Sequence, residues 1–226
     1  WEILIASSDT TSFFQTKSCY DFYRSVKTLR PFVYAVQQNH QLQALVCGYL
    51  VSSSVFPINY FSRRAIIPGG LLIRNNCPAT AIELLLSHLK NELKHQAIYI
   101  EFRNFNDYSP WKESFQKAGF EYVAHYNVQN KLDSYQSDTI SKLFAEEKQR
   151  QLKKATAHQI TCEQVQTNSE LKAFYILLSS FYRKEIRLPL FPFDFFVNLQ
   201  RLTNAALFIV KHNNEIVGGI VLVHDH

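Results

Sequence analysis

A carboxylate and a guanidinium lie side by side on one predicted strand, Ala97–Arg103. This segment is short and rich in β-forming residues, and Glu101 and Arg103 stand two positions apart at its C-terminal end. Side chains two apart on a strand share a face, and α/β sheets place their sites beyond the C-terminal strand ends. Glu101 could therefore serve as a base. We favour the alternative, a structural ion pair with Arg103, because buried charges are normally paired.

Two further arginines precede a break in a predicted strand. Arg63 and Arg64 come shortly before Pro68-Gly69-Gly70. Such a break could let backbone N–H groups approach an anion, with the arginines as further donors. A plain turn is the alternative, and we favour it.

A third group of basic residues lies within seven positions of a charged, predicted helix. Lys148, Arg150, Lys153 and Lys154 form this group, and Arg150 and Lys154 share one helical face. Arg150, Lys153 and Lys154 are therefore candidates for binding RNA or phosphate. The alternative that we favour is a solvated helix face, as charge runs usually are.

Basic and aromatic residues also occur together near the end of a predicted helix over Asn168–Lys184. Arg183 and Arg187 could hold a phosphorylated ligand, for which arginine offers bidentate hydrogen bonds. The alternative is solvated surface charge. Tyr182 is a weaker candidate, because the aromatic residues before it favour packing in a core.

The elements that must position these residues begin with two similar hairpins. Val33–Val46 and Leu207–Ile220 each show an apolar run, a short polar stretch that contains Asn, and a second apolar run. Asn tolerates positive φ, so both segments predict hairpins. Their similarity indicates two copies of one α/β unit.

The order of the other elements predicts a mixed α/β sheet. We expect helices over Ser12–Lys27, Ala79–His95, Ser109–Lys117, Asp138–His158, Asn168–Lys184 (capped by Asn168) and Pro192–Leu202. We expect strands over Tyr60–Arg74 (a strand pair or one bent strand, broken at Pro68-Gly69-Gly70), Ala97–Arg103, Phe120–Val128 and Gln159–Gln166. The expected domains are residues 1–135, a basic connecting helix over 136–158, and the start of a second domain over 159–226.

Composition narrows the class of protein only modestly. The chain of 226 residues has a formal charge of +5 and a pI near 9.0, which favours anionic partners. No apolar stretch reaches the roughly 20 residues that span a bilayer. No signal peptide is evident either, so we expect a cytoplasmic protein. The cysteines are scattered without a C-x-x-C pair, so we predict neither a metal site nor a disulfide framework.

Several phrases, in this order, resemble one family, the Fem-type (FemABX-like) transferases. They are Tyr60-Phe61-Ser62-Arg63-Arg64-Ala65-Ile66-Ile67-Pro68-Gly69-Gly70, Tyr99-Ile100-Glu101-Phe102-Arg103-Asn104, Phe115-Gln116-Lys117-Ala118-Gly119-Phe120, Lys148-Gln149-Arg150-Gln151-Leu152-Lys153-Lys154-Ala155, Phe181-Tyr182-Arg183-Lys184 and Ile216-Val217-Gly218-Gly219-Ile220. The fourth phrase is similar to the family's basic helix of the form R-x-x-I-R-K-A. The motifs are spread over nearly the whole chain.

The resemblance implies tandem GNAT-like acyltransferase domains, the second of which we expect to be incomplete. It also implies the acylation of an amine, with aminoacyl-tRNA as donor and a peptidoglycan precursor as acceptor in the best-known members. The family places acceptor-contacting basic and aromatic residues where Arg183, Arg187 and Tyr182 lie. Two departures stand out: the chain shows no coiled-coil arm, and it has no pyrophosphate loop of the form R-x-x-G-x-G/A.

The leading hypothesis is a transferase that moves an aminoacyl or acyl group to an amine of a cell-envelope precursor. The donor would be aminoacyl-tRNA or acyl-CoA, without a permanently bound cofactor, and the acceptor a small-molecule or lipid-linked anion. Three alternatives are an acyl-CoA-dependent N-acetyltransferase, a non-catalytic GNAT-like module that binds an anionic ligand, and a basic RNA-binding protein. The sequence assigns no catalytic residue and no oligomeric state.

Overall fold

The computed structural model describes residues 1–52, 58–127 and 144–224. The chain forms two compact units, one that contains Trp1–His125 and the other Tyr126–Leu222. Each unit is described by itself. Among the described residues, no helix has both the length and the apolar character that crossing a bilayer requires.

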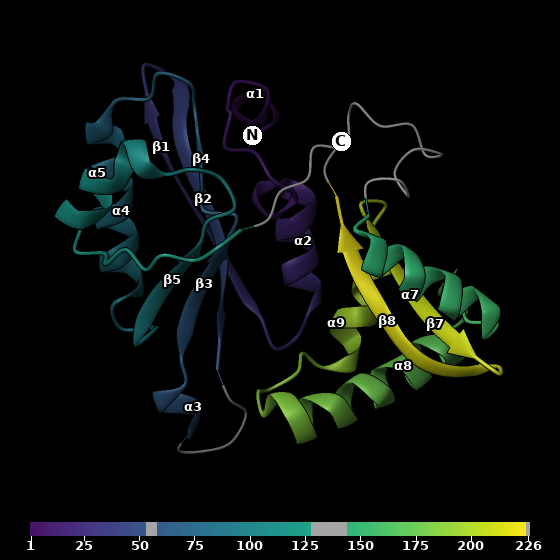
Figure 1. Ribbon diagram of the computed structural model, residues 1–226. Helices are drawn as coiled ribbons and strands as arrows, with labels where there is room; N and C mark the ends of the chain where they lie inside the picture. The colour runs from purple at the N-terminus through teal and green to yellow at the C-terminus, as the bar shows by residue number, and fades with distance from the viewer. Residues whose placement is uncertain (53–57, 128–143, 225–226) are drawn as a thin grey trace. The chain divides into compact units, whose positions relative to one another are not determined.

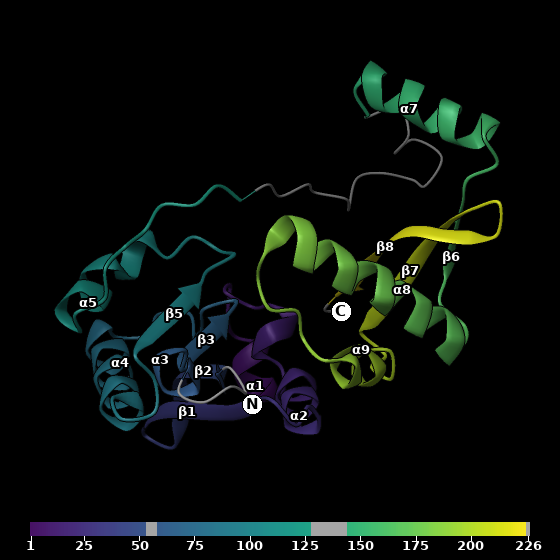
Figure 2. The same ribbon diagram turned by 90° about the horizontal axis from the view of Figure 1, so that it is seen from below.

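The first unit is a mixed sheet with helices on both faces (Figures 1 and 2). Its sheet runs in the order β1-β2-β3-β5, and β4 also pairs with β2. The strands are β1 (Arg30–Gln38), β2 (Gln41–Val51), β3 (Arg64–Pro68), β4 (Leu71–Ile73) and β5 (Tyr99–Arg103). The helices are α1 (Glu2–Ile5), η1 (Phe13–Gln15), α2 (Lys17–Ser25), α3 (Ile58–Phe61), α4 (Ala79–Leu93), η2 (Ser109–Trp111) and α5 (Lys112–Lys117).

The main core lies between the sheet and α4. The helix buries Ile82, Leu85, Leu86 and Leu89, at the spacing of three and four expected for one helical face. The opposite sheet face is covered by α1 and α2, where Leu4 packs with Leu45, Cys47 and Leu72. Alternate residues of β2 therefore serve two cores, as the two-residue period of a strand requires.

The break at Pro68-Gly69-Gly70 bends one long strand into β3 and β4, as the sequence predicted. β2 pairs with β3 through Tyr49–Val51 and with β4 through Ala44–Val46. Both glycines have positive φ, 78° and 79°, which side chains with a Cβ rarely adopt. A Cβ on Gly70 would lie 2.4 Å from the Asn104 Oδ1 atom, so neighbouring groups fill the space around the break.

Three buried polar side chains satisfy the carbonyl groups at this break. The Tyr108 hydroxyl donates to the carbonyls of Gly69 (3.0 Å) and Leu71 (2.6 Å). The Gln15 side chain also donates to the Gly69 carbonyl (3.0 Å), and the Thr10 hydroxyl to that of Leu71 (3.0 Å). The N-terminal segment and the loop after β5 are thereby tied to the sheet at one point.

The second unit contains a three-stranded sheet with α8 and α9 packed together beside it. Its elements are α7 (Glu146–Ala157), β6 (Thr161–Gln164), α8 (Asn168–Phe181), η4 (Tyr182–Ile186), α9 (Phe193–Leu199), β7 (Ala205–His212) and β8 (Glu215–Val223). Strand order is β6-β7-β8. Phe174 of α8 contacts the backbone position of Gly219, where a Cβ would come within 2.7 Å of its ring. Close packing of α8 on β8 thus depends on this glycine.

The predicted hairpins are both confirmed, and their turns have the same backbone conformation. Asn39 and His40 have φ of 51° and 61°, and Asn213 and Asn214 have φ of 51° and 65°. Two consecutive residues with positive φ match the twist of the flanking strands in a two-residue hairpin turn. The two units therefore contain the same hairpin, which is the feature that suggested the repeat.

The strand predicted over Phe120–Val128 and the predicted cap of α8 are both wrong. Residues 120–127 form no strand, and residue 128 lies outside the described residues. The cap of α8 is Thr167 and not Asn168: its hydroxyl accepts the N–H of Glu170 (3.2 Å), whose carboxylate accepts the N–H of Thr167 (3.2 Å). This reciprocal capping box begins one residue earlier than the predicted cap. Of the predicted helix over Asp138–His158, positions 138–143 also lie outside the described residues.

An ion-pair network joins β6, α8 and β7 in the second unit. The Lys211 ammonium lies 2.8 Å from a Glu170 carboxylate oxygen and 2.9 Å from one of Glu163. The pKa of Glu170 is lowered from an ordinary 4.5 to about 2, and the hydrogen bond from Lys211 is the main cause. The same carboxylate caps α8, so one side chain secures both the start of the helix and its place on the sheet.

The four cysteines occupy different environments. Cys19 and Cys47 are buried in the first unit, and burial raises the pKa of each thiol, that of Cys19 to about 12. Cys77 is half-buried. Cys162, on β6, is exposed to solvent.

Replacing Tyr108 with Phe tests the network at the break. We expect the free energy of unfolding to fall by about 1–2 kcal/mol, because two buried carbonyls lose a donor while each keeps one other. Urea denaturation would measure the change. Tyr122→Phe is the matched control, since Tyr122 is 64% exposed, and it should change stability little. An equal effect of both substitutions would contradict the role given to the Tyr108 hydroxyl.

Acid should remove the stabilisation that Glu170 provides. The pKa of Glu170 is lower in the folded protein than the ordinary value, so its contribution is present above pH 4.5 and is lost as pH falls toward 2. The difference in unfolding free energy between wild type and Glu170→Gln should therefore shrink through this range. Denaturant titrations at a series of pH values would measure it, and a constant difference would contradict the prediction.

Candidate functional site

The end of α8 has an unusual backbone. After Phe181 the chain makes one turn of π-helix, η4, in which the Arg187 N–H donates to the Tyr182 carbonyl at 2.7 Å. Arg187 then adopts the left-handed conformation, with φ 58° and ψ 27°. π-Turns and left-handed residues other than glycine both concentrate at functional sites. We therefore take η4 and Arg187 together, the π-turn, as the first candidate site.

Three cationic side chains project from the π-turn. Arg183, Lys184 and Arg187 are exposed, and none makes an ion pair with any of the described residues. Glu185 is the one acidic residue between them, so the turn carries an excess of positive charge. Tyr182 is half-buried, which fits the packing role weighed from the sequence. The two guanidinium groups can each bind a phosphate or carboxylate through two hydrogen bonds.

The π-turn is held from both sides. Before it, Leu171 and Phe174 of α8 are buried in the core of the second unit. After it, the Tyr175 hydroxyl donates to the Phe191 carbonyl at 3.2 Å, which draws the returning chain back to α8. The cations of the turn are thus displayed on a fixed backbone, not on a free loop.

A second cluster lies on the sheet of the first unit. Strand register pairs Arg64 with Tyr99 and Ile66 with Glu101, so Arg64, Tyr99, Glu101 and Arg103 share one face of β3 and β5. We call these four residues the sheet-face cluster. The Arg103 Nε atom lies 2.7 Å from a Glu101 oxygen, and this hydrogen bond is the main cause that raises the pKa of Arg103. The predicted ion pair is therefore present, but it is half-exposed and not buried.

Tyr49 of β2 borders the sheet-face cluster. Its side chain is 6% exposed and packs on Tyr23 of α2, with ring centroids 4.8 Å apart. Burial raises the pKa of Tyr49, while the guanidinium charges of Arg103 and Arg64 oppose that shift. Both guanidinium groups therefore lie within electrostatic reach of one phenol. The sequence did not single out Tyr49 or Tyr99, although Tyr99 stands two residues before Glu101.

Arg63 and Arg64 differ in their surroundings. The Arg63 guanidinium stacks 4.2 Å from the centre of the Tyr60 ring and donates to the carbonyls of Tyr60 and His95, both at 3.2 Å. These contacts favour a structural role for Arg63. The Gly69 N–H donates to the Arg103 carbonyl at 2.9 Å, so it is engaged within the fold. This hydrogen bond favours a structural role for the strand break, and anion binding there stays a prediction.

Arg150, Lys153 and Lys154 are exposed on α7, a helix without buried residues. Polar side chains one turn apart on this helix form hydrogen bonds with one another; for example, Lys148 donates to Gln151 at 3.2 Å. This environment suits a solvated helix and equally a surface that meets RNA, so their binding role stays a prediction.

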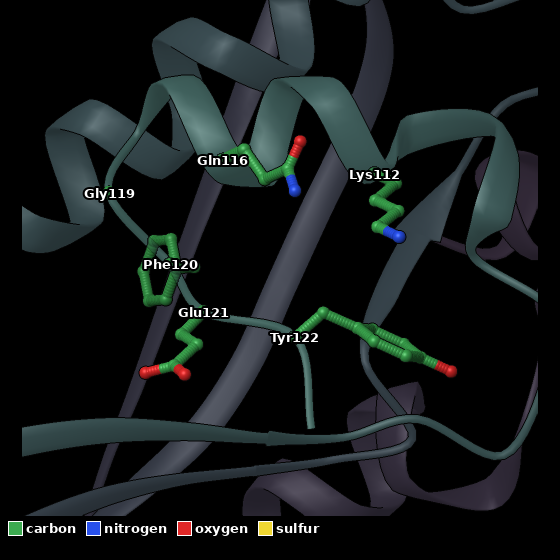
Figure 3. A pocket seen from close by; sticks show the side chains of 6 residues that line it. All are labelled: Lys112, Gln116, Gly119, Phe120, Glu121 and Tyr122. Atoms are coloured by element: carbon green, nitrogen blue, oxygen red, sulfur yellow. The ribbon is translucent and has the colours of Figure 1, made fainter. Parts of the chain in front are cut away.

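A shallow depression of about 510 Å³ lies beside α5 (Figure 3). The Lys112 ammonium lies 5.3 Å from the centre of the Tyr122 ring at one end, and Phe120 and Glu121 lie toward the other. Gln116 and Gly119 complete its lining. Sequence reasoning gave no signal for this hollow. Its few polar groups do not converge on one point, so we assign it no ligand.

Comparison with solved structures identifies the architecture. The crystal structure of FemX is similar over 93% of this chain and 55% of its own, with 16% identity and a TM-score of 0.59. The chain has a Fem-like fold. The mixed α/β architecture and the Fem-like fold expected from the sequence are therefore confirmed, and the similarity is one of fold. The chain spans about half the length of FemX, and the Fem-like domain boundaries stay a prediction.

Other comparisons add little to the Fem-like assignment. A probable acetyltransferase is similar over 47% of this chain and 70% of its own, with 14% identity and a TM-score of 0.34, too low to support an argument. No protein-family model matches the chain, and no curated protein has a significantly similar sequence.

Arg187 should stabilise the protein less than glycine would. A left-handed conformation costs a residue with a Cβ about 1 kcal/mol, and glycine avoids this cost. Arg187→Gly should therefore raise the free energy of unfolding by roughly that amount, whereas Arg187→Gln should leave it nearly unchanged. Urea denaturation would measure both. A clear loss of stability in Arg187→Gln would show that the guanidinium supports the fold and would contradict its assignment to ligand binding.

Proposed function

We propose that this protein is an N-acyltransferase that moves an aminoacyl or acyl group to an amine of a peptidoglycan-type, cell-envelope precursor. The Fem-like fold, similar to FemX over 93% of the chain, is the observation that carries this proposal. The predicted motifs of the Fem-type transferases occur along the same chain in the same order.

The π-turn suits the anionic part of such an acceptor. Cell-envelope precursors of this type carry phosphate, and Arg183 and Arg187 offer ten guanidinium N–H donors between them, five from each arginine. Neither guanidinium is engaged in an ion pair among the described residues, so a ligand need not displace a protein partner. In this proposal the two arginines fix the acceptor, and Lys184 adds long-range attraction.

The proposed donor is aminoacyl-tRNA, with acyl-CoA as the alternative. The exposed cations of α7, Arg150, Lys153 and Lys154, suit contact with a phosphate backbone. The absence of an R-x-x-G-x-G/A loop from the sequence argues against CoA in the first unit. Both donors are substrates, and the reaction needs no resident cofactor. We place it in the cytoplasm, where charged tRNA and soluble precursors occur.

A second candidate is a GNAT-like module that binds an anionic ligand without chemistry. The observation in its favour is that Glu101, proposed as a base, is held by Arg103 at 2.7 Å. One Glu101 oxygen is therefore already engaged within the fold. Turnover of any amine acceptor would exclude this candidate.

A transfer assay tests the proposed function. Full-length protein is incubated with radiolabelled aminoacyl-tRNA or acyl-CoA and a uridine diphosphate-linked muropeptide, and amide formation is followed by chromatography. Arg183→Gln and Arg187→Gln should each raise the KM for the acceptor about tenfold or more, because each removes a charge-assisted pair, while kcat changes little.

Arg24→Gln serves as the control for this assay. Arg24 is an exposed arginine on α2 whose guanidinium lies 3.9 Å from Asp21, and its replacement should leave KM unchanged. Absence of transfer from either donor, together with absence of precursor binding by calorimetry, would refute the proposal. An unchanged KM in both π-turn variants would refute the role of the π-turn.

A further inference from the structure

The sheet-face cluster is an open part of an otherwise covered face. α2 packs over Tyr49 through Tyr23, and α1 packs over Leu45 and Cys47. Beyond these contacts Tyr99 is 45% exposed, and the side chains of Glu101 and Arg103 are 36% and 52% exposed. Two guanidinium groups, a carboxylate and a phenol ring therefore face solvent from two neighbouring strands.

Several donors and acceptors of the sheet-face cluster have no partner among the described residues. Arg103 reaches Glu101 through its Nε atom alone, and the second Glu101 oxygen has no hydrogen-bond partner among the described residues. Arg64 makes no ion pair within that part of the chain. One carboxylate oxygen can thus accept from a ligand, while Arg64 and the outer nitrogens of Arg103 can donate to it.

From this arrangement we propose that the sheet-face cluster binds a zwitterionic head group, in which an ammonium and a carboxylate stand on the same carbon. The ligand ammonium donates to Glu101, and the ligand carboxylate accepts from Arg64 and Arg103. Tyr99, opposite Arg64 in the register, borders the bound group with its ring.

The mixture of charges is what favours a zwitterion. A lone phosphate or carboxylate would meet repulsion from Glu101, and a lone amine would meet repulsion from two guanidinium groups. Arg64 lies two register positions from Glu101 and four from Arg103, so the two arginines start roughly 13 Å apart along the strands, with Glu101 between them. Their long side chains can converge on a ligand beside Glu101, and a ligand with both charges on one carbon then contacts each group with the matching sign.

This inference rests on the proposed function and makes it more specific. It predicts that the acceptor amine of the transferase belongs to an amino-acid head group with a free carboxylate. In that arrangement Glu101 contacts the ammonium directly, at the position from which a carboxylate can take its proton. Arg64 and Arg103 orient the acceptor through its carboxylate.

Glycine and its two halves provide the test. Protein labelled with nitrogen-15 in arginine is titrated with glycine, methylamine, acetate and inorganic phosphate, and the Nε–H signals of Arg64 and Arg103 are followed by NMR. Glycine should shift both signals saturably, with a Kd in the range of roughly 1 mM. Methylamine, acetate and phosphate should bind about tenfold more weakly or worse, because each satisfies only one sign of charge.

Variants separate the proposed contacts from general effects. Glu101→Gln and Arg64→Gln should each weaken glycine binding about tenfold, and Arg64→Lys should restore part of it. The affected side chains are exposed or half-buried, so these variants should fold, which circular dichroism checks. Arg24→Gln, the same kind of change on α2, should bind glycine like the wild type.

Several results would overturn the inference. They are the absence of a saturable shift with glycine, equal binding of glycine and methylamine or acetate, tighter binding of phosphate, and wild-type binding by Glu101→Gln. The transfer assay is independent of this titration. If glycine binds as expected but no donor transfers a group, the proposed function fails while the zwitterion site stands. If transfer occurs without glycine binding, only this inference fails.

Discussion

The hydrogen bonds around Gly69 and Leu71 are the constraint on which the first unit depends. β3 and β4 both pair with β2, and β3 must also pair with β5, so the chain has to bend between them. The bend leaves carbonyl groups without partners in a neighbouring strand. Tyr108, Gln15 and Thr10 supply the missing donors from two distant parts of the chain. Since Arg64 joins Glu101 and Arg103 on one face only through the β3–β5 register, the sheet-face cluster is a product of that bend.

Local sequence signals predicted most of the elements, because each is governed by neighbours along the chain. Positive φ at Asn39 and Asn213 and the apolar stripe of α4 need no knowledge of distant contacts. The wrong predictions have two causes: two neighbouring residues could serve the same role, or the structure depends on residues far away in the sequence. Thr167 and Asn168 are both good caps, and the reciprocal bond with Glu170 decides between them. Residues 120–127 have strand-forming composition but pair with no strand among the described residues.

The candidate sites were predictable to a lesser degree. The two-residue period of a strand was enough to pair Glu101 with Arg103, but it did not show that the pair is half-exposed, because exposure depends on which elements pack on that face. Arg63 could not be distinguished from Arg64 by sequence, since its partner His95 lies 32 positions away. The sequence predicted that the α8 helix continues through the π-turn. Shifting a backbone hydrogen bond by one residue does not change the apolar periodicity of the sequence, so the π-turn could not be predicted. The Fem-like resemblance, by contrast, needed only the order of short motifs.

The unequal exposure of the thiols makes the two units chemically distinguishable. Cys19 and Cys47 are buried and their thiols resist ionisation, so a maleimide, which reacts with the thiolate, has little access to them in the native protein. Cys162 stands in solvent on β6, one residue from Glu163 and its partner Lys211. With the half-buried Cys77 of the first unit replaced by serine, a fluorophore attached to Cys162 would sense the surroundings of α8 and β7 while the core around α2 stayed unlabelled, which gives the second unit an optical reporter of its own.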